Sequence, residues 1–245
     1  ALIHAHRELA ERAGPELGPQ MLLRADALLR ERLRDDRTGF DVLRQGVGLF
    51  PANEEVYEAL FERSTALGRL DALDSHLSRC IDKALDPQTA ATLLARRATL
   101  LEGPLGRSQQ AIEVLTKLLQ LRPDDSNAAA RLRRTLRKAR RFPDLLLAIH
   151  KQLQRAKEPD ERVALIKESA NIWEGDLRNR FEARDAWRKA LELSPHDAEA
   201  AAGVARTEQR LSAPHLLSEP PAASAVDGEP EPEVARGPEP EPSVP

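Results

Sequence analysis

Six prolines recur at a fixed spacing of 36 residues along the chain: Pro15, Pro51, Pro87, Pro123, Pro159 and Pro195. A fixed period of this size is the sequence signature of a repeat array, in which similar structural units stack in a row. Each unit of such an array packs only on its neighbours, so the chain length does not set a number of globular domains. The period therefore constrains the fold more than any single motif does.

The residues around the periodic prolines predict corners between helices. Proline cannot continue a preceding helix, and a polar residue that can cap the next helix stands two places later, at Asn53, Asp125 and Asp197. Apolar residues then recur at helical spacing, as at Tyr57 and Leu60. A short break and a second amphipathic stretch complete the unit. Aromatic residues make up only 3% of the chain, which also favours an all-α fold of antiparallel helix hairpins.

The second helix of alternate units carries a small, large, small face. The matching triplets are Gly39, Leu43 and Gly46; Ala111, Leu115 and Leu118; and Ala183, Trp187 and Ala190. This pattern, which ends in L-x-P-x-D, resembles the tetratricopeptide repeat (TPR), although the unit here is two residues longer than the usual one. Over residues 15–211 the resemblance implies an α-solenoid of antiparallel helix hairpins wound into a right-handed superhelix. It also implies that the first helices line a concave wall, where peptides or helices of partner proteins lie.

Alternate units differ, so the true period is a two-hairpin superunit of 72 residues. For example, Leu77 and Ile81 match Ile149 and Leu153 at this shift. We expect residues 1–14 to be the trailing helix of a truncated upstream repeat, and the chain to be a fragment of a longer array. Residues 15–211 form the predicted repeat array, and residues 212–245 a disordered, acidic tail rich in Pro and Glu. Such a tail cannot bury enough apolar surface to offset its conformational entropy.

Several classes of protein are excluded by the absence of their motifs. One cysteine provides neither a disulfide framework nor a cysteine-rich zinc site. The chain has no phosphate-binding loop and no H-E-x-x-H zinc motif, and no apolar run long enough to cross a membrane. We therefore expect no enzymatic activity, no cofactor and no membrane span, and a cytoplasmic location. Thirty arginines against seven lysines suggest a GC-rich bacterial source.

The resemblance to the TPR family also selects candidate binding residues on the first helices. The inward positions that it implies are Glu55, Glu58, Glu62, Asn127, Arg134, Arg137, Lys138, Arg206 and Arg210. Lys167 and Asn171 look like one corner of a carboxylate clamp, whereas Glu199 and Gly203 stand where further clamp residues would be needed. These positions predict a noncatalytic protein–protein interaction scaffold, with a concave groove that is acidic at one end and basic at the other. The groove would bind peptide or helical segments of partners.

The segment RLRRTLRKARR, residues 131–141, leaves three interpretations open. It holds seven basic side chains, which can form a solvated face whose arginine stems cover apolar surface. It can equally bind acidic protein segments through forked guanidinium–carboxylate pairs. The tail carries a net charge of −6, so the protein's own tail is one candidate for such an acidic segment. The alternative function is RNA or DNA binding through this segment, against which stand the few aromatics and the net charge of −3.

Overall fold

The computed structural model describes residues 2–212, and every regular element among them is a helix. The predicted all-α fold is confirmed for this part of the chain. Its elements are α1 (Leu2–Leu28), the π-helical η1 (Leu29–Leu33), α2 (Asp36–Leu49), α3 (Glu54–Ala66), α4 (Leu70–Lys83), α5 (Pro87–Glu102), α6 (Ser108–Leu121), α7 (Ser126–Lys138), α8 (Phe142–Leu153), α9 (Pro159–Asn171), the π-helical η2 (Ile172–Asp176), α10 (Arg180–Leu193) and α11 (Ala198–Ser212).

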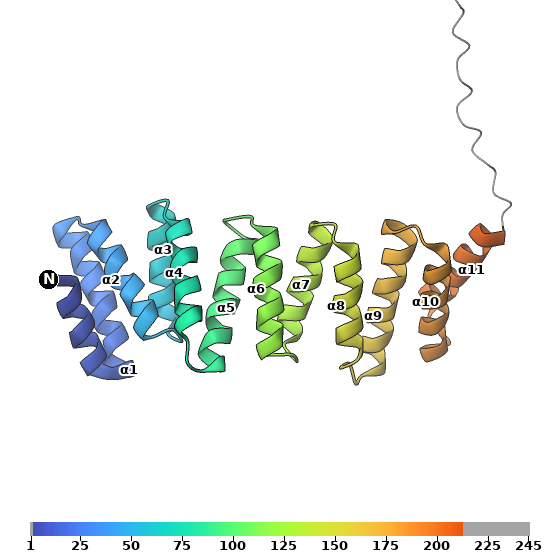
Figure 1. The fold of residues 1–245 in the computed structure, drawn as a ribbon, viewed down its shortest axis with the longest axis horizontal. Helices are drawn as coiled ribbons and strands as arrows, with labels where there is room; N and C mark the ends of the chain where they lie inside the picture. The colour runs from blue at the N-terminus through green and yellow to red at the C-terminus, as the bar shows by residue number, and fades with distance from the viewer. Residues whose placement is uncertain (1, 213–245) are drawn as a thin grey trace, which may run out of the picture. The chain divides into compact units, whose positions relative to one another are not determined.

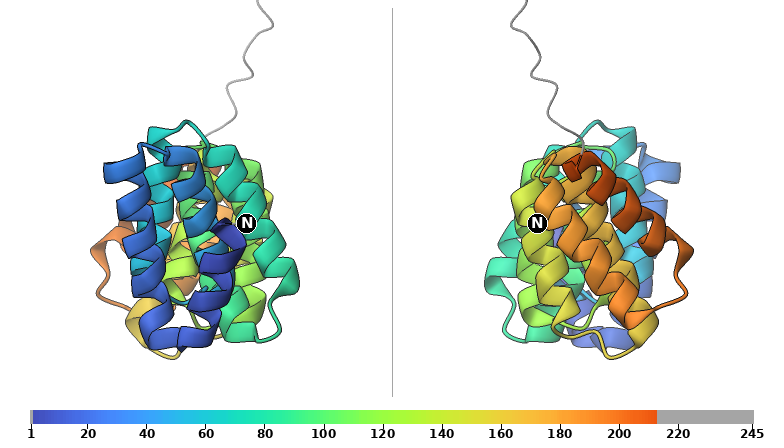
Figure 2. Two further views of the ribbon diagram at one scale, coloured as in Figure 1. Left: turned by 90° about the vertical axis from the view of Figure 1, so that its left-hand side faces the viewer. Right: turned by 90° about the vertical axis from the view of Figure 1, so that its right-hand side faces the viewer.

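Helices that follow one another along the chain pack side by side as antiparallel pairs (Figures 1 and 2). We call α3, α5, α7, α9, α11 and the 15–28 part of α1 the first helices. The second helices are α2, α4, α6, α8 and α10.

The apolar core follows the order of the helices along the chain. One cluster joins residues of α2 to α5, a second joins α5 to η2, and a third joins α9 to α11. The core is thus a series of overlapping interfaces between neighbours, as a repeat array requires.

A kink divides α1 into two helices at Gly14. This residue has φ 78° and ψ −177°, a backbone conformation that glycine adopts readily and that other residues avoid. Pro15 follows directly and begins the next helix. The kink lies beside the expected boundary between residues 14 and 15, which stays a prediction.

The predicted corners are confirmed at the periodic prolines. The side chains of Asn53 and Asp125 each accept a hydrogen bond, of 2.9 Å, from the backbone N–H three residues later. Asp197 caps α11 in the same way at 2.9 Å. Pro87 and Pro159 begin α5 and α9, where the missing proline N–H leaves no helical hydrogen bond unmade. The periodic proline thus marks where five helices begin, namely α3, α5, α7, α9 and α11.

The small, large, small faces of the second helices are buried, as predicted. A Cβ added to Gly39 would collide with the carboxylate of Asp26 on the neighbouring first helix, and one added to Gly46 would collide with Leu22. Small residues therefore let first and second helices approach closely. Trp187, the largest residue of the three faces, is fully buried, in agreement with its predicted role in packing.

The predicted tail lies outside the described residues except for Ser212, which is the last residue of α11. Among the helices of residues 2–212, none is both long enough and apolar enough to cross a membrane.

Candidate functional site

Ion pairs join consecutive first helices along the array. Between α5 and α7, the carboxylate of Glu102 accepts hydrogen bonds from Arg131 Nε at 2.7 Å and from Thr135 Oγ1 at 2.8 Å. Between α7 and α9, Glu168 pairs with Arg133 at 3.1 Å and with Arg137 at 3.0 Å. Each carboxylate here holds two side chains of the neighbouring first helix, so the contacts fix the spacing of adjacent first helices.

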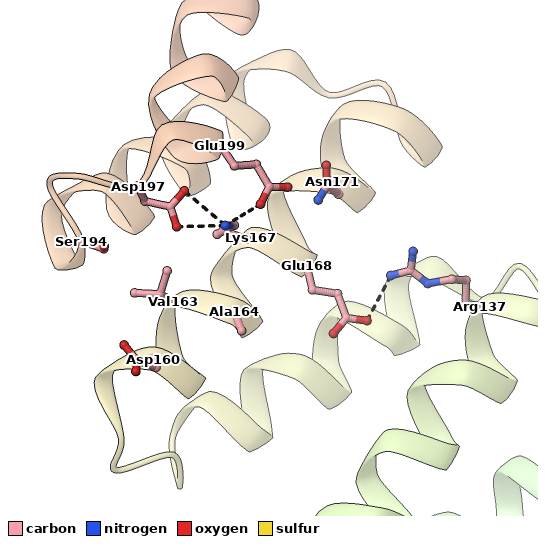
Figure 3. A pocket seen from close by; sticks show the side chains of 10 residues that line it. All are labelled: Arg137, Asp160, Val163, Ala164, Lys167, Glu168, Asn171, Ser194, Asp197 and Glu199. Atoms are coloured by element: carbon pink, nitrogen blue, oxygen red, sulfur yellow. Dashed lines mark hydrogen bonds and ion pairs between the residues drawn. The ribbon is translucent and has the colours of Figure 1, made fainter.

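Lys167 forms the corresponding contact between α9 and the start of α11 (Figure 3). Its ammonium group lies 2.9 Å from Asp197 Oδ2 and 2.5 Å from Glu199 Oε2. The hydrogen bond to Glu199, followed by that to Asp197, raises the pKa of Lys167 above its ordinary value. The hydrogen bond from Lys167 in turn lowers the pKa of Asp197, together with the backbone N–H of Ala200. The positive charge of Lys167 is therefore balanced by two carboxylates of this chain.

A surface pocket of about 530 Å³ opens among these side chains. Three consecutive first helices and the corner before α11 contribute to it (Figure 3). Its lining residues are Arg137, Asp160, Val163, Ala164, Lys167, Glu168, Asn171, Ser194, Asp197 and Glu199. Its four carboxylates outnumber its two cations, and both cations already have carboxylate partners. The carboxylate of Asp160 has no hydrogen-bond or ion-pair partner among the described residues.

The structure brings three of the predicted site residues together in this pocket: Arg137, Lys167 and Asn171. Asn127, Arg134 and Lys138 lie exposed on α7, and their side chains make no hydrogen bond or ion pair within residues 2–212. The predicted acidic end, Glu55, Glu58 and Glu62, is exposed on α3. The candidate residues thus form a pocket, a basic stripe beside it, and a separate acidic stripe.

Arg206 and Arg210, the remaining candidates, lie on α11 and both bind Glu174. Arg206 Nε donates to Glu174 Oε1 at 2.6 Å, and Arg210 Nη1 donates to the same oxygen at 2.9 Å. Trp187 Nε1 donates to the other carboxylate oxygen at 3.1 Å. The hydrogen bond from Arg206 is the main reason why the pKa of Glu174 is lowered. Glu174 is therefore the centre of an intramolecular contact that the sequence analysis did not single out.

A sequence signal for Glu174 does exist in the 72-residue period, because Glu102 stands 72 residues earlier and also binds an arginine of the next first helix. Gly203, which stands at a position that a carboxylate clamp would need, is explained by packing. The indole ring of Trp187 lies directly against its Cα, where a Cβ would collide with the ring. At Glu199, the side chain neutralises Lys167. Gly203 therefore serves helix packing, and Glu199 forms an internal ion pair.

No group of three or more His, Cys, Asp or Glu side chains within residues 2–212 is arranged to hold a metal ion. The polar groups that line the pocket are carboxylates, two cations, the amide of Asn171 and the hydroxyl of Ser194.

No model of a protein family matches the sequence, and no curated protein matches it either. Solved structures do show similarity. The MamA protein of Desulfovibrio magneticus RS-1 is 21% identical, with 64% of this chain and 84% of that chain covered and a TM-score of 0.40. A thermophilic TPR protein of Thermus thermophilus is 16% identical, with 78% and 99% covered and a TM-score of 0.35. BtubC from P. vanneervenii is 12% identical, with 99% and 100% covered and a TM-score of 0.39.

These TM-scores are low, and the fold of this chain is defined by its own helices. The 36-residue period, the capped corners after the prolines and the buried small, large, small faces occur together in consecutive helix pairs. The described residues therefore form an all-helical repeat array of the TPR-like type.

Proposed function

We propose that the chain is a noncatalytic scaffold that binds peptide or helical segments of other proteins on its first helices. The observation that carries this proposal is the pocket between α7, α9 and α11, which brings Arg137 of α7 together with Lys167 and Asn171 of α9. Pockets with a few convergent polar groups are the usual places for ligands. Repeat arrays offer extended binding surfaces of this kind because each repeat adds similar positions side by side.

The charges around the pocket suggest which side chains a partner presents. Arg134 and Lys138 stand four residues apart on α7, so they share one face of the helix. Both are exposed and have no internal carboxylate partner among the described residues. They favour an acidic partner segment, as predicted for the basic end of the groove. Inside the pocket, the unpaired carboxylate of Asp160 favours a basic or amide side chain from the same segment.

Peptide binding tests this assignment. The probe is a fluorescein-labelled 12-residue peptide with glutamate at every second position, compared with its lysine counterpart by fluorescence anisotropy. We expect the glutamate peptide to bind, and the double variant Arg134→Glu and Lys138→Glu to weaken that binding at least tenfold. The matched control is Lys151→Glu with Arg155→Glu, which makes the same charge change on and just after the second helix α8. Equal affinity of both double variants for the peptide contradicts the proposed site.

Nucleic-acid binding through residues 131–141 is the competing function. Of the seven basic side chains there, Arg131, Arg133, Arg137 and Arg141 already pair with carboxylates of this chain. Fewer free cations remain to displace counterions from a phosphate backbone. A titration with a single-stranded oligonucleotide separates the two functions. A steep fall of affinity with salt, together with tighter binding than the glutamate peptide, supports nucleic acid as the ligand.

The acidic tail as an internal ligand of the basic stripe is part of the same proposal. A tethered segment can reach an effective concentration of about millimolar, but each exposed ion pair contributes only about 0 to 1 kcal/mol. The tail would therefore compete weakly with an external peptide. A chain that ends at Ser212 should bind the glutamate peptide more tightly than the full chain at low salt, and equal affinities exclude the competition.

A further inference from the structure

Within residues 2–212, each turn between a first helix and its second helix contains one residue in the left-handed backbone conformation. The φ values lie between 51° and 63°, at Arg34, Gly68, Gly106, Arg140 and Arg178. Figure 1 shows these turns along one edge of the described array, which we call the turn edge. In this conformation a Cβ comes too close to the following carbonyl oxygen, so glycine is favoured and other residues cost free energy.

The 72-residue period shows that these turns do not need an arginine. Arg178 corresponds to Gly106, and Arg140 corresponds to Gly68. A Cβ placed on either glycine meets nothing within 4 Å, so this position of the turn faces open space. The chain therefore carries arginine at two positions where glycine forms the same turn without strain. Residues that are held in unfavourable backbone conformations cluster at functional sites.

The side chains of Arg140 and Arg178 have no role in joining the helices. Both are exposed and make no hydrogen bond or ion pair with the described residues. The arginines one position later in two of the turns differ from them. Arg107 forms an ion pair with α4, and Arg141 donates hydrogen bonds of 2.7 Å and 3.0 Å to side chains of α8 and α6. The guanidinium groups of Arg140 and Arg178 thus remain available to a ligand.

Arg140 continues the row of unpaired cations on α7. Arg134 and Lys138 are exposed on this helix, Lys138 is its last residue, and Arg140 follows two residues later. Arg178 lies in the next turn along the same edge, after α9 and η2. Helices in contact lie about 8–10 Å apart, so consecutive turns are about 20 Å apart. An extended segment of about 12 residues spans about 40 Å and is long enough to reach all four cations.

We propose that Arg140 and Arg178 bind the acidic part of the partner segment where this segment crosses the turn edge. This role rests on the proposed function and deepens it, because it fixes where the acidic part of the partner lies. A guanidinium group offers its N–H donors in a fork that matches a carboxylate. Since neither arginine has a carboxylate partner among the described residues, binding here costs no internal ion pair.

The pocket gives the partner segment a polarity. Asp160 lies at the start of α9 and Asn171 at its end, from which η2 continues to the turn edge. The unpaired carboxylate of Asp160 is thus at the opposite end of α9 from the turn that carries Arg178. A partner places its basic or amide residue at Asp160 and its acidic residues towards the turn edge. A nucleic acid, which is anionic along its whole backbone, fits this arrangement less well.

Binding of the fluorescein-labelled glutamate peptide to the full chain, measured by anisotropy, tests the role of the two arginines. We expect Arg140→Gly with Arg178→Gly to weaken binding about tenfold at low salt, and each single variant to weaken it about threefold. The matched control is Arg34→Gly. It removes one charge from a residue of the same backbone conformation in the turn before α2, and it should leave the affinity unchanged.

Thermal unfolding separates a loss of binding from a loss of folding. The double variant introduces the residue type that forms the equivalent turns at Gly68 and Gly106. It should therefore unfold at the same temperature as the wild-type chain or at a higher one. A lower unfolding temperature would show that the two arginines serve the fold, and would overturn the proposal.

The remaining outcomes identify other causes or other occupants. Equal weakening by Arg34→Gly assigns the effect to the total charge of the chain and overturns the proposal. Tighter peptide binding by the double variant than by the wild-type chain shows that the arginines hold the acidic tail and not a partner. A single-stranded oligonucleotide that binds more tightly than the peptide, and that the double variant releases, makes nucleic acid the ligand of the turn edge.

Failure of this proposal can be told apart from failure of the proposed function. Peptide binding that the Arg134→Glu and Lys138→Glu variant weakens, but that Arg140→Gly with Arg178→Gly leaves unchanged, overturns the role of the turn edge alone. Absence of any binding of the glutamate peptide to the wild-type chain overturns both.

Discussion

Close contacts between single residues set the distance between neighbouring helices. Gly203 of α11 lies against the indole of the fully buried Trp187 of α10. Thr207, one turn later, is also fully buried and donates its hydroxyl hydrogen bond to the carbonyl oxygen of Gly203 at 2.7 Å. The packing of α10 against α11 therefore depends on the absence of a side chain at Gly203.

The substitution Gly203→Ala is expected to destabilise the chain by about 1 to 3 kcal/mol, because the new methyl group collides with the Trp187 ring in a close-packed interior. Urea unfolding measures the loss. The matched control is Gly175→Ala, since nothing lies within 4 Å of a Cβ placed there. A shift no larger than that of the control would show that α10 and α11 separate easily.

His76 on α4 provides a test of pH dependence. Its pKa is lowered to about 4, first by burial and then by the charge of Arg44, with smaller contributions from Arg79 and Lys83. The folded state therefore keeps the imidazole neutral, whereas the unfolded chain protonates it near pH 6.5. Since the unfolded state then binds more protons, stability that is present at pH 7 is lost as the pH falls from 6.5 towards 4.

We expect the wild-type chain to lose about 2 kcal/mol more than a His76→Asn variant between pH 7 and pH 4.5, after allowance for the partial exposure of the ring. Urea unfolding at both pH values gives the difference. Subtraction of the variant removes the contribution of the carboxylates, which titrate in both proteins. Parallel pH profiles for the two proteins would show that His76 is solvated when folded.

At the scale of elements, the hairpins could be predicted because their signals are local. Pro123 and Asp125 specify the corner before α7 without reference to any distant residue. The partners of the candidate cations could not be predicted in this way. Lys167 meets Asp197 and Glu199 about 30 residues away, and such contacts depend on how neighbouring repeats are packed. The π-helical η2, which continues α9 to Asp176, also has no local signal that we recognise.

The cap of α7 gives a prediction for one element. Asp125→Ala removes the acceptor of the Ala128 N–H and should destabilise the chain by about 1 kcal/mol. Thermal unfolding measures this loss. The adjacent Asp124→Ala serves as the control, because Asp124 is exposed and caps no helix. Equal unfolding temperatures for the two variants would mean that water replaces the cap without cost.

At the scale of the whole described array, stability should be transmitted only between neighbours. The contacts between elements join helices that are close in chain order, so a defect at one end has no direct route to the other. We expect Gly203→Ala to accelerate hydrogen exchange in α10 and α11 while exchange in α5 and α6 stays unchanged. Mass spectrometry of exchanged peptides reads both regions in one sample. Uniform acceleration along residues 2–212 would show a single cooperative unit instead.

The pairing of Glu102, Glu168 and Glu174 with arginines of a neighbouring first helix has a consequence for any acidic ligand. Such a ligand can gain a contact with those arginines only when an internal carboxylate gives one up. Binding of an acidic ligand at these positions then replaces an internal carboxylate with one from the ligand, so the number of ion pairs stays nearly constant. Selectivity must come from the shape of the incoming segment and from exposed cations that have no carboxylate partner among the described residues, such as Arg134 and Lys138.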